Sequence, residues 1–412
     1  MRILFLNPCG RMGGAETSLV ELVAGLRGAE PSLDLWLVAG EDGPLLEKAR
    51  ALGVSVELLP FPDVVARLGD AGTRPLNAFL LTARAGMAAI VYARRLAKLV
   101  HRIQPQIVHT NGFKMHVLGA WAAARQAPVL WHIHDYVSTR PLMRRLLGCS
   151  ASRSTAIIVN SASVAADVRA VLPAVPVTPI YNAVDMERFA PAGPTLDLDA
   201  LSGLPPAPEG TVRAGLVATF ARWKGHQVFL EALSRLTPQS MVRGYIIGGP
   251  IYQTGRSQWS LDELQERCRK LGLDGRVGFP GFVDDTPAAM RALDIAVHAS
   301  TQPEPFGMAI VEAMACGRAV IASAAGGALE IFQNDDNALS HRPGDADDLA
   351  RQIDRLVKNE PLRHRLGQSA RAAVERRFHR RRLGEELTDF YGRVSRRQIS
   401  FAPGAFSPTP LQ

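Results

Sequence analysis

The sequence predicts an α/β protein with two doubly wound domains, each built on a parallel sheet. The chain has 412 residues, and a single hydrophobic core usually stops growing at about 250 to 300 residues, so two domains are expected. Short apolar runs alternate with longer helical patterns along most of the chain, as strands followed by helices do. A stretch rich in Pro, Gly and Ala, residues 191–209, interrupts the alternation and predicts a linker.

The first half of the chain contains seven short apolar runs with the length of buried strands. They lie at residues 3–7, 33–39, 54–59, 107–110, 129–134, 156–160 and 177–181. Helical patterns fall between them, near residues 15–27, 44–52, 77–103, 114–125 and 161–171. Strands that are apolar on both faces need helices on both sides, so this order predicts a covered parallel sheet.

The same alternation restarts after the expected linker. Strands are expected at residues 214–219, 244–248, 276–279, 295–298 and 319–322, and helices near 225–236, 261–272, 286–292, 307–316 and 346–358. Two further helices, 361–376 and 380–396, end the pattern. Two such sheets facing each other would place a ligand-binding cleft at the carboxyl ends of their strands.

The charge distribution limits the kinds of partner. The net charge is +8, and residues 363–397 hold eleven arginines against four acidic residues, which accounts for seven of these charges. A solvated helix face, attraction to anionic lipid and, least favoured, nucleic acid stay open as explanations. Because no helix-turn-helix or RNA-binding signature accompanies the arginines, no nucleic-acid partner is expected.

Cysteine spacing and hydropathy predict a cytoplasmic protein. The four cysteines lie far apart with no C-x-x-C spacing, so neither a zinc site nor a disulfide framework is expected. The N-terminal run MRILFLN is too short for a signal peptide. Four basic residues interrupt the most apolar stretch, 76–100, so it is not expected to cross a membrane. Its basic and apolar side chains, with Arg140, Arg144 and Arg145, suit peripheral attachment to the inner face of a cell membrane.

A glycine-bearing turn follows the first expected strand. Gly13 and Gly14 lack the Cβ atoms that would keep a ligand at a distance, and the helix after them offers its positive N-terminal end to a phosphate. The spacing is not G-x-G-x-x-G, so a tight turn without a ligand is an equal alternative.

A second strand-to-helix turn carries two glutamates eight positions apart. Glu304 lies on the expected loop at the carboxyl edge of the sheet, and Gly307 lets the amides at the helix start face a diphosphate. Glu312 lies just over one turn into the helix, where it can accept hydrogen bonds from two vicinal ribose hydroxyls. The alternative is an exposed loop carboxylate and a surface helix residue, although a carboxylate among apolar neighbours needs a partner.

Residues 304–317, E-P-F-G-M-A-I-V-E-A-M-A-C-G, closely resemble the donor-site motif of the family 4 retaining glycosyltransferases, which have the GT-B fold. Shorter matches in the same order lie at residues 13–16, 107–111, 132–135, 181–185, 223–225, 294–297 and 326–330. The resemblance implies an acceptor-binding domain over 1–188, a nucleotide-sugar-binding domain over 189–376, a helix over 377–398 that packs back on the first domain, and a flexible tail over 399–412.

The resemblance also implies roles for residues of the motif. Glu312 would bind the ribose of the nucleotide. Glu304 would contact hydroxyls of the donor sugar, and Gly307 and Met308 would offer backbone amides to the diphosphate.

By the same resemblance, His134 would line the sugar pocket close to the anomeric carbon. A histidine at the end of a strand is otherwise more often structural. His132 points to the same side of an ideal strand, so the choice between the two histidines stays open.

A cation must neutralise the leaving diphosphate. Family members carry an arginine five residues before the motif lysine, and here that position is Thr219. Lys224 is therefore the expected cation, with Arg222 as the candidate substitute for the missing arginine and a solvated Arg222 as the equal alternative. The D-x-D string of Asp197 and Asp199 falls in the linker and matches by chance, so neither a metal nor another cofactor is expected.

The function implied by the resemblance is transfer of a hexosyl unit, with retention, from a nucleoside diphosphate sugar to a hydroxyl of a glycan or lipid-linked acceptor. The pathway would be assembly of the cell envelope or of an exopolysaccharide. The acceptor would attack from the side of the leaving group, and a departing phosphate oxygen would take its proton. A sugar-nucleotide epimerase, a glycan phosphorylase and a noncatalytic nucleotide-sugar-binding protein of the same fold are the alternatives.

Overall fold

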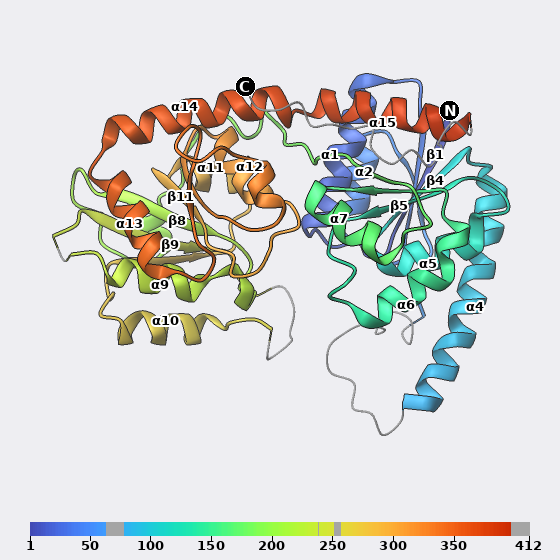
Figure 1. The fold of residues 1–412 in the computed structure, drawn as a ribbon, viewed down its shortest axis with the longest axis horizontal. Helices are drawn as coiled ribbons and strands as arrows, with labels where there is room; N and C mark the ends of the chain where they lie inside the picture. The colour runs from blue at the N-terminus through green and yellow to red at the C-terminus, as the bar shows by residue number, and fades with distance from the viewer. Residues whose placement is uncertain (63–77, 238, 251–256, 397–412) are drawn as a thin grey trace. The chain divides into compact units, whose positions relative to one another are not determined.

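The computed structural model describes residues 1–62, 78–237, 239–250 and 257–396, and their packing divides the chain into two units (Figure 1). The N-terminal unit comprises residues 1–181 and the segment that begins at Leu383, and the C-terminal unit comprises residues 182–382. The domain limits expected at 188 and 376 stay predictions, and the expected tail, 399–412, lies outside the described residues.

A parallel sheet of seven strands forms the centre of the N-terminal unit, within the part of the chain described. The strands are β1 (Arg2–Asn7), β2 (Asp34–Ala39), β3 (Ser55–Leu58), β4 (Ile107–Asn111), β5 (Val129–Ile133), β6 (Ala156–Val159) and β7 (Val177–Pro179). Their spatial order is β3-β2-β1-β4-β5-β6-β7, with every neighbouring pair parallel. The predicted parallel sheet is confirmed. Its order reverses between β1 and β4, the kind of position where such sheets bind ligands.

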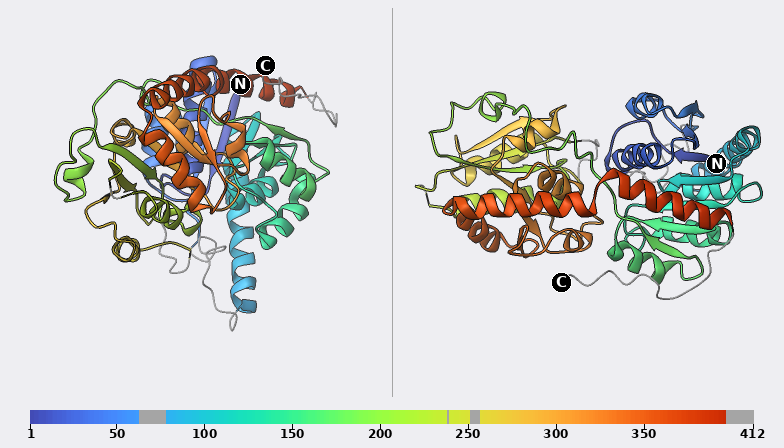
Figure 2. Two further views of the ribbon diagram at one scale, coloured as in Figure 1. Left: turned by 60° about the vertical axis from the view of Figure 1, so that its left-hand side comes forward. Right: turned by 90° about the horizontal axis from the view of Figure 1, so that it is seen from above.

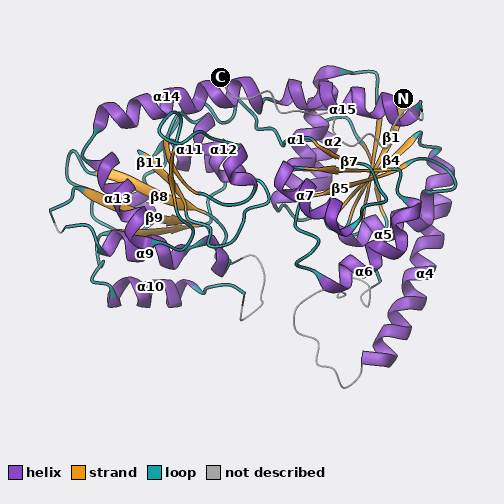
Figure 3. Ribbon diagram, in the orientation of Figure 1, coloured by secondary structure: helices purple, strands orange, loops and turns teal. Residues whose placement is uncertain are grey.

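Helices cover both faces of this sheet (Figure 3). They are α1 (Gly14–Ala29), α2 (Pro44–Ala51), α4 (Ala78–Ile103), α5 (Phe113–Ala123), α6 (Pro141–Ser150) and α7 (Ala162–Val171). Helix α6 was not expected from the sequence, although Pro141 occupies its first turn, a favoured position for proline. Among the described residues no helix, α4 included, is both long and apolar enough to cross a bilayer.

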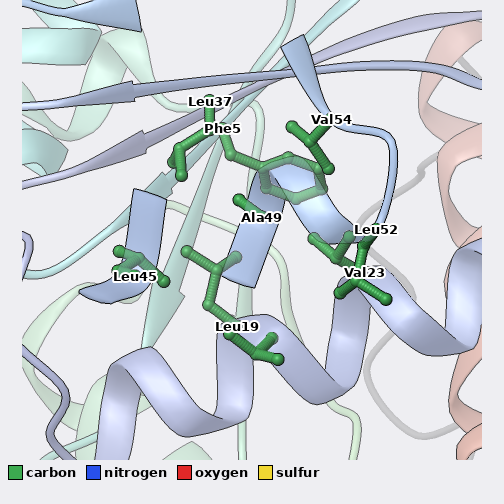
Figure 4. A pocket seen from close by; sticks show the side chains of 9 residues that line it. Phe5, Leu19, Val23, Leu37, Leu45, Ala49, Leu52 and Val54 are labelled. Carbon is green, nitrogen blue, oxygen red and sulfur yellow. The ribbon is translucent and has the colours of Figure 1, made fainter. Parts of the chain in front are cut away.

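The contact of α1 and α2 with β1 and β2 illustrates the core. Phe5, Leu19, Leu37 and Leu45 belong to the side chains that line a small hollow there, and every residue of that lining is apolar (Figure 4). Each of these four is at most 3% exposed. The hollow is therefore a packing feature without the polar groups that orient a ligand.

The C-terminal unit repeats the architecture around a sheet of six parallel strands among the described residues. The strands are β8 (Val212–Val217), β9 (Val242–Ile247), β10 (Val277–Gly281), β11 (Ile295–His298), β12 (Ala319–Ser323) and β13 (Leu339–His341), in the order β10-β9-β8-β11-β12-β13. The edge strand β13 has only three residues and was missed by the sequence analysis. The helices are α8 (Leu198–Leu201), α9 (His226–Ser234), α10 (Leu261–Lys270), α11 (Thr286–Arg291), α12 (Met308–Ala315), α13 (Ala346–Val357) and α14 (Glu360–Arg377).

The segment expected to be a linker is anchored to this unit. Leu198 and Asp199 of α8 are buried. Asp199 accepts hydrogen bonds from Arg243 at 2.7 Å and from the Tyr245 hydroxyl at 2.6 Å. Burial would raise the pKa of Asp199, but the bonds from Tyr245 and Arg243 lower it to about 2. The segment is therefore fixed to β9 by a buried ion pair.

Helix α15 (Arg380–Ser395) returns the chain to the N-terminal unit, as the resemblance implies (Figure 2). A Cβ atom at Gly384 would lie 2.0 Å from the carbonyl oxygen of Gly25, so glycine permits close contact between α15 and α1. The hydroxyl of the buried Tyr391 lies 2.8 Å from Nδ1 of His109 on β4. The last helix is thus part of the first core.

Several arginines of the basic C-terminal region are bound within the fold. Arg371 donates to the carbonyl oxygen of Phe189 at 2.7 Å. Arg377 donates to the carbonyl of Ile331 at 2.9 Å, and Arg380 pairs with a carboxylate at 2.9 Å. These contacts account for part of the basic excess without an external partner.

Candidate functional site

The carboxyl edge of the C-terminal sheet brings together Lys224 and Glu304, which lie 80 residues apart in the sequence. Lys224 ends the short 3-10 turn η3 (Arg222–Lys224) after β8, and Glu304 lies on the loop between β11 and α12. Between the two loops, Gly225 has φ of 77°, and a Cβ atom there would lie 1.8 Å from the carbonyl oxygen of Ala299. Glycine is therefore required for the approach that places lysine beside glutamate.

Polar contacts surround both carboxylate oxygens of Glu304. The ammonium of Lys224 lies 2.9 Å from each of them. The Ser300 hydroxyl donates to Oε2 at 2.8 Å, and Nε2 of His298 lies 3.1 Å from the same oxygen. Glu304 is only 7% exposed. Burial alone would raise its pKa, but the Lys224 ammonium and the hydrogen bond from His298 hold that pKa well below its ordinary value. The carboxylate is therefore ionised and held in one orientation.

The N-terminus of α12 lies directly after this carboxylate. Gly307 has φ of 116° and precedes the first helical residue, Met308, and no side chain caps the helix. A Cβ atom at Gly307 would approach Ile310 Cδ1 to 2.9 Å. Glu312, half-buried, lies one turn further along α12. This geometry combines a helix N-terminus, which favours an anion, with a carboxylate that can accept hydrogen bonds from hydroxyl groups.

Arg222 makes its contacts elsewhere. Its guanidinium pairs with Glu263 at 2.9 Å and lies 3.8 Å from the centre of the Trp259 ring. Only Lys224 of the two expected cations contacts Glu304 in the described structure. The role expected for Arg222 at the diphosphate stays a prediction, and it would require this stacked ion pair to open.

At the carboxyl edge of the N-terminal sheet, two asparagine amides and a histidine ring are linked by hydrogen bonds. Nε2 of His134, just after β5, lies 2.7 Å from Oδ1 of Asn111 at the end of β4. Nδ2 of Asn111 donates to Oδ1 of Asn7, at the end of β1, at 2.6 Å. Burial lowers the pKa of His134 to about 4, so its imidazole is neutral near pH 7. Three adjacent strands thus contribute one chain of hydrogen bonds.

His132 has different surroundings from His134. It is 3% exposed, and its Nδ1 lies 3.1 Å from Nε2 of His109, which in turn contacts Tyr391. His134 is partly exposed. The two rings lie 4.0 Å apart. The geometry therefore connects His132 to the interior and leaves His134 as the candidate for the sugar contact.

Gly13 and Gly14 form the start of α1. Gly13 precedes the helix in an extended conformation, and a Cβ atom there would lie 3.0 Å from a carboxylate oxygen of Glu16. A Cβ atom at Gly14 meets nothing within 4 Å. The packing of the described residues thus restricts Gly13 and leaves space at Gly14.

Two family models match consecutive parts of this chain. One, described as Glycosyltransferase Family 4, matches residues 12–188, and the other, described as Glycosyl transferases group 1, matches residues 205–373. The chain belongs to glycosyltransferase family 4. The predicted family is confirmed, and both sheet edges described above lie within the matched regions.

Relatives of this family 4 chain include proteins of lipopolysaccharide assembly. The lipopolysaccharide core biosynthesis glycosyltransferase LpsE of Rhizobium meliloti is 31% identical over 172 residues, 42% of this chain and 46% of LpsE. The chain therefore spans less than half the length of that relative. The N-acetyl-alpha-D-glucosaminyl L-malate synthase of Bacillus anthracis is 22% identical over 317 residues, 74% of this chain and 80% of that protein.

Solved structures share the whole fold. HepE of Anabaena in complex with UDP has a TM-score of 0.75 and 25% identity, covering 95% of this chain and 100% of HepE. A glycosyltransferase of Rickettsia africae has a TM-score of 0.75 and 18% identity, covering 95% and 98%. Together with the two parallel sheets, these likenesses confirm the predicted GT-B fold.

Sequence reasoning missed four side chains that fix the candidate residues of this family 4 chain: His298, Ser300, Asn7 and Asn111. His298 and Ser300 lie two positions apart at the end of an expected strand, so the alternation of side chains could have placed both on one side. Asn7 likewise ends an expected strand, and Asn111 directly follows another.

The D-x-D string has structural roles in the family 4 chain. Asp197 caps α8 by accepting a hydrogen bond from the amide of Ala200 at 3.0 Å, and Asp199 forms the buried ion pair of that helix. Across the residues that the structure describes, no group of three or more His, Cys, Asp or Glu side chains could hold a metal ion. The absence of a metal requirement stays a prediction.

Proposed function

We propose that the protein transfers a hexosyl unit from a nucleoside diphosphate sugar to a hydroxyl group, with retention of anomeric configuration. The observation that carries the proposal is the pair of the half-buried Lys224 with the buried Glu304, beside the N-terminus of α12. The family adds support, and so does the Anabaena relative, whose structure contains UDP. The relatives of lipopolysaccharide core synthesis favour a glycan or lipid-linked acceptor in cell-envelope or exopolysaccharide assembly.

The proposed chemistry follows from the charges at this edge. Negative charge grows on the diphosphate as the bond to the sugar breaks, and the helix N-terminus at Gly307 and the Lys224 ammonium stabilise it. Glu304 is ionised and fixed, so it accepts hydrogen bonds from sugar hydroxyls and orients the ring. The acceptor oxygen forms the new bond on the face that the leaving group vacates, and its proton passes to a departing phosphate oxygen.

Glu312 provides a direct test of donor binding. Glu312→Ala removes the proposed ribose contact, so the donor dissociation constant should rise roughly tenfold, the loss expected for hydrogen bonds to a charged group. Isothermal titration measures it, with Glu266→Ala on the exposed face of α10 as the matched carboxylate control. Unchanged donor affinity in Glu312→Ala would contradict the assignment.

The donor can be identified by thermal shift. A ligand that binds only the folded protein raises its melting temperature in proportion to RT ln(1 + [L]/Kd). A panel of UDP, GDP, ADP and dTDP sugars should give one selective shift, and Glu312→Ala should reduce it. A shift of equal size with every base would contradict recognition of a particular nucleotide.

Product analysis distinguishes the alternatives. With a labelled donor, a transferase releases nucleoside diphosphate only together with a glycosylated acceptor or slow hydrolysis. An epimerase changes the donor sugar without an acceptor, a phosphorylase requires inorganic phosphate, and a noncatalytic binding protein leaves the donor intact. Retention is read from the anomeric configuration of the product.

We also propose that the protein attaches to the surface of an anionic membrane through the outer side chains of α4, α5 and α6, named here the α4–α6 surface. Half of the twelve exposed large apolar side chains of the described residues lie on these helices. They are Met87, Ile90, Val91, Trp121, Leu142 and Leu146. In Figure 1 the first turns of α4 extend beyond α5 and α6.

The charge of the α4–α6 surface suits anionic lipid. Residues 78–103, 113–123 and 141–150 include no Asp or Glu. Arg94, Arg95, Lys98, Arg144 and Arg145 are exposed beside the apolar side chains. Each basic residue near an anionic surface adds about 1 kcal/mol of attraction, and apolar side chains beside them can enter the interfacial layer.

Vesicle flotation tests the membrane proposal. The protein should float with vesicles containing phosphatidylglycerol and should not float with phosphatidylcholine alone. Met87→Ser with Ile90→Ser should reduce flotation, whereas Phe282→Ser, which removes a 62% exposed side chain of the C-terminal unit, should not. No flotation with either kind of vesicle would overturn the proposal.

A further inference from the structure

The hydrogen bonds around His134 determine which of its ring nitrogens carries the proton. The determination starts at Asn7, which is fully buried. Its Nδ2 lies 2.6 Å from the carbonyl oxygen of Cys9 and 3.3 Å from Oε1 of Glu16. The carbonyl oxygen of Cys9 can only accept a hydrogen bond, so the amide of Asn7 has one possible orientation.

The orientation of the Asn7 amide determines that of the Asn111 amide. Oδ1 of Asn7 accepts a hydrogen bond from Nδ2 of Asn111 at 2.6 Å, and the same Nδ2 lies 3.4 Å from the carbonyl oxygen of Ala15. Asn111, which is 1% exposed, must therefore present its carbonyl oxygen to His134. Since that oxygen lies 2.7 Å from Nε2 of His134 and can only accept, the proton of the neutral imidazole is on Nε2.

The other ring nitrogen is then an acceptor without a donor. Nδ1 of His134 is buried and has no hydrogen-bond partner among the described residues. A buried polar atom without a partner costs about 1 to 3 kcal/mol. A hydroxyl group satisfies such a nitrogen, whereas a phosphate oxygen, being only an acceptor near neutral pH, does not.

We infer that Asn7 and Asn111 are positioning residues that fix His134 in the Nε2–H tautomer, so that its Nδ1 accepts a hydrogen bond from a hydroxyl of the transferred sugar. The inference rests on the proposed function for its substrate. The tautomer itself rests only on the contacts of Asn7, Asn111 and His134. Asn7 and Asn111 act through the histidine and have no role in touching the sugar.

The tautomer is measured by nitrogen NMR on protein labelled with 15N-histidine, with His134→Asn used to assign the signals. Wild type should show protonated Nε2 and unprotonated Nδ1 at His134. Asn111→Leu should give a mixture of tautomers and lower kcat roughly tenfold, the effect of one lost hydrogen bond, with donor affinity unchanged. Asn111→Asp keeps an acceptor for Nε2–H and should restore the tautomer.

Asn160→Leu is the matched control, because Asn160 is 3% exposed, against 1% for Asn111, and its Nδ2 lies 3.4 Å from the backbone oxygen of His134 without contacting the ring. It should leave the tautomer unchanged. A wild-type signal from Nδ1–H, or an unchanged tautomer in Asn111→Leu, would overturn the inference. If wild type transfers no sugar, the proposed function fails, while the comparison of tautomers still decides the role of Asn111.

Discussion

The two sheet edges differ in chemistry although the sheets share one architecture. At the N-terminal edge, amides and neutral imidazoles form a chain through Asn7, Asn111 and His134. At the C-terminal edge, a buried carboxylate and an ammonium lie 2.9 Å apart. Neutral donors and acceptors match hydroxyl groups, and fixed charges beside a helix N-terminus match a diphosphate. The residues that follow the strands therefore set the ligand chemistry, and the strands set only where those residues meet.

Burial opposes charge at both edges, but only the C-terminal edge has partners that outweigh it. It lowers the pKa of His109 to about 3 and of His134 to about 4, so these rings remain uncharged. Glu304 is buried as well, but Lys224 and His298 outweigh the effect of burial and keep its pKa low. A buried group loses its charge unless a partner compensates for the loss of water.

The largest expected effect comes from removing the compensating cation. Lys224→Met leaves the Glu304 carboxylate with only its contacts to His298 and Ser300, so the free energy of unfolding should fall by about 3 to 5 kcal/mol. Turnover should fall on the order of 100-fold, because the leaving diphosphate loses its cation. Urea unfolding and initial rates measure the two effects.

Glu304→Gln in the Lys224→Met background provides the control for this prediction. Removing the negative charge should recover part of the lost stability, because no unpaired charge then remains buried. If Lys224→Met is as stable as wild type, the charged edge does not depend on this pair.

Acid should affect the neutral edge first. In the folded protein, the pKa values of His109 and His134 lie below the ordinary value of 6.5. Below pH 6.5 the unfolded chain therefore binds more protons than the folded protein does. Stability is therefore full above pH 6.5 and falls as the pH decreases toward 4. Each histidine costs roughly 1.4 kcal/mol per pH unit within this window, so His109 and His134 should together cost about 3 kcal/mol between pH 5.5 and 4.5. His116 and His132, whose pKa values burial also lowers, should add to this loss.

Hydrogen exchange read by mass spectrometry can assign the acid effect to a unit. The C-terminal unit also contains a buried histidine, His226, with a pKa lowered to about 4, so it should lose protection too, but less. Equal loss of protection in both units at pH 5 would contradict the contrast between the edges.

A smaller effect is expected from the glycine that joins the two loops of the charged edge. Gly225→Ala adds a Cβ atom that would collide with the carbonyl oxygen of Ala299. The free energy of unfolding should fall by on the order of 2 to 3 kcal/mol. Gly272→Ala has a similar positive φ of 67° but open space around its Cβ position, so it should cost about 1 kcal/mol. Similar losses in the two variants, read from melting temperatures, would show that the loops do not depend on this contact.

Much of the fold could be predicted from the sequence because buried parallel strands are continuous apolar runs. The edge strand β13 was missed because its sequence, Leu-Ser-His, contains no apolar run. Lys224 and Glu304 were identified separately, yet their pairing was not, because it depends on the contact of Gly225 with Ala299, 74 positions away. The links of Asn7 and Asn111 to His134 join three strands and have no signal in local spacing.

The position of α15 has a consequence for how the chain is made. Leu387, Phe390 and Tyr391 fill the first core, but the ribosome adds them only after all of residues 182–382. In the nascent chain, the N-terminal sheet is therefore incompletely covered until the last helix has been synthesised. An excised fragment ending near residue 181 would have the same gap, with His109 lacking its tyrosine.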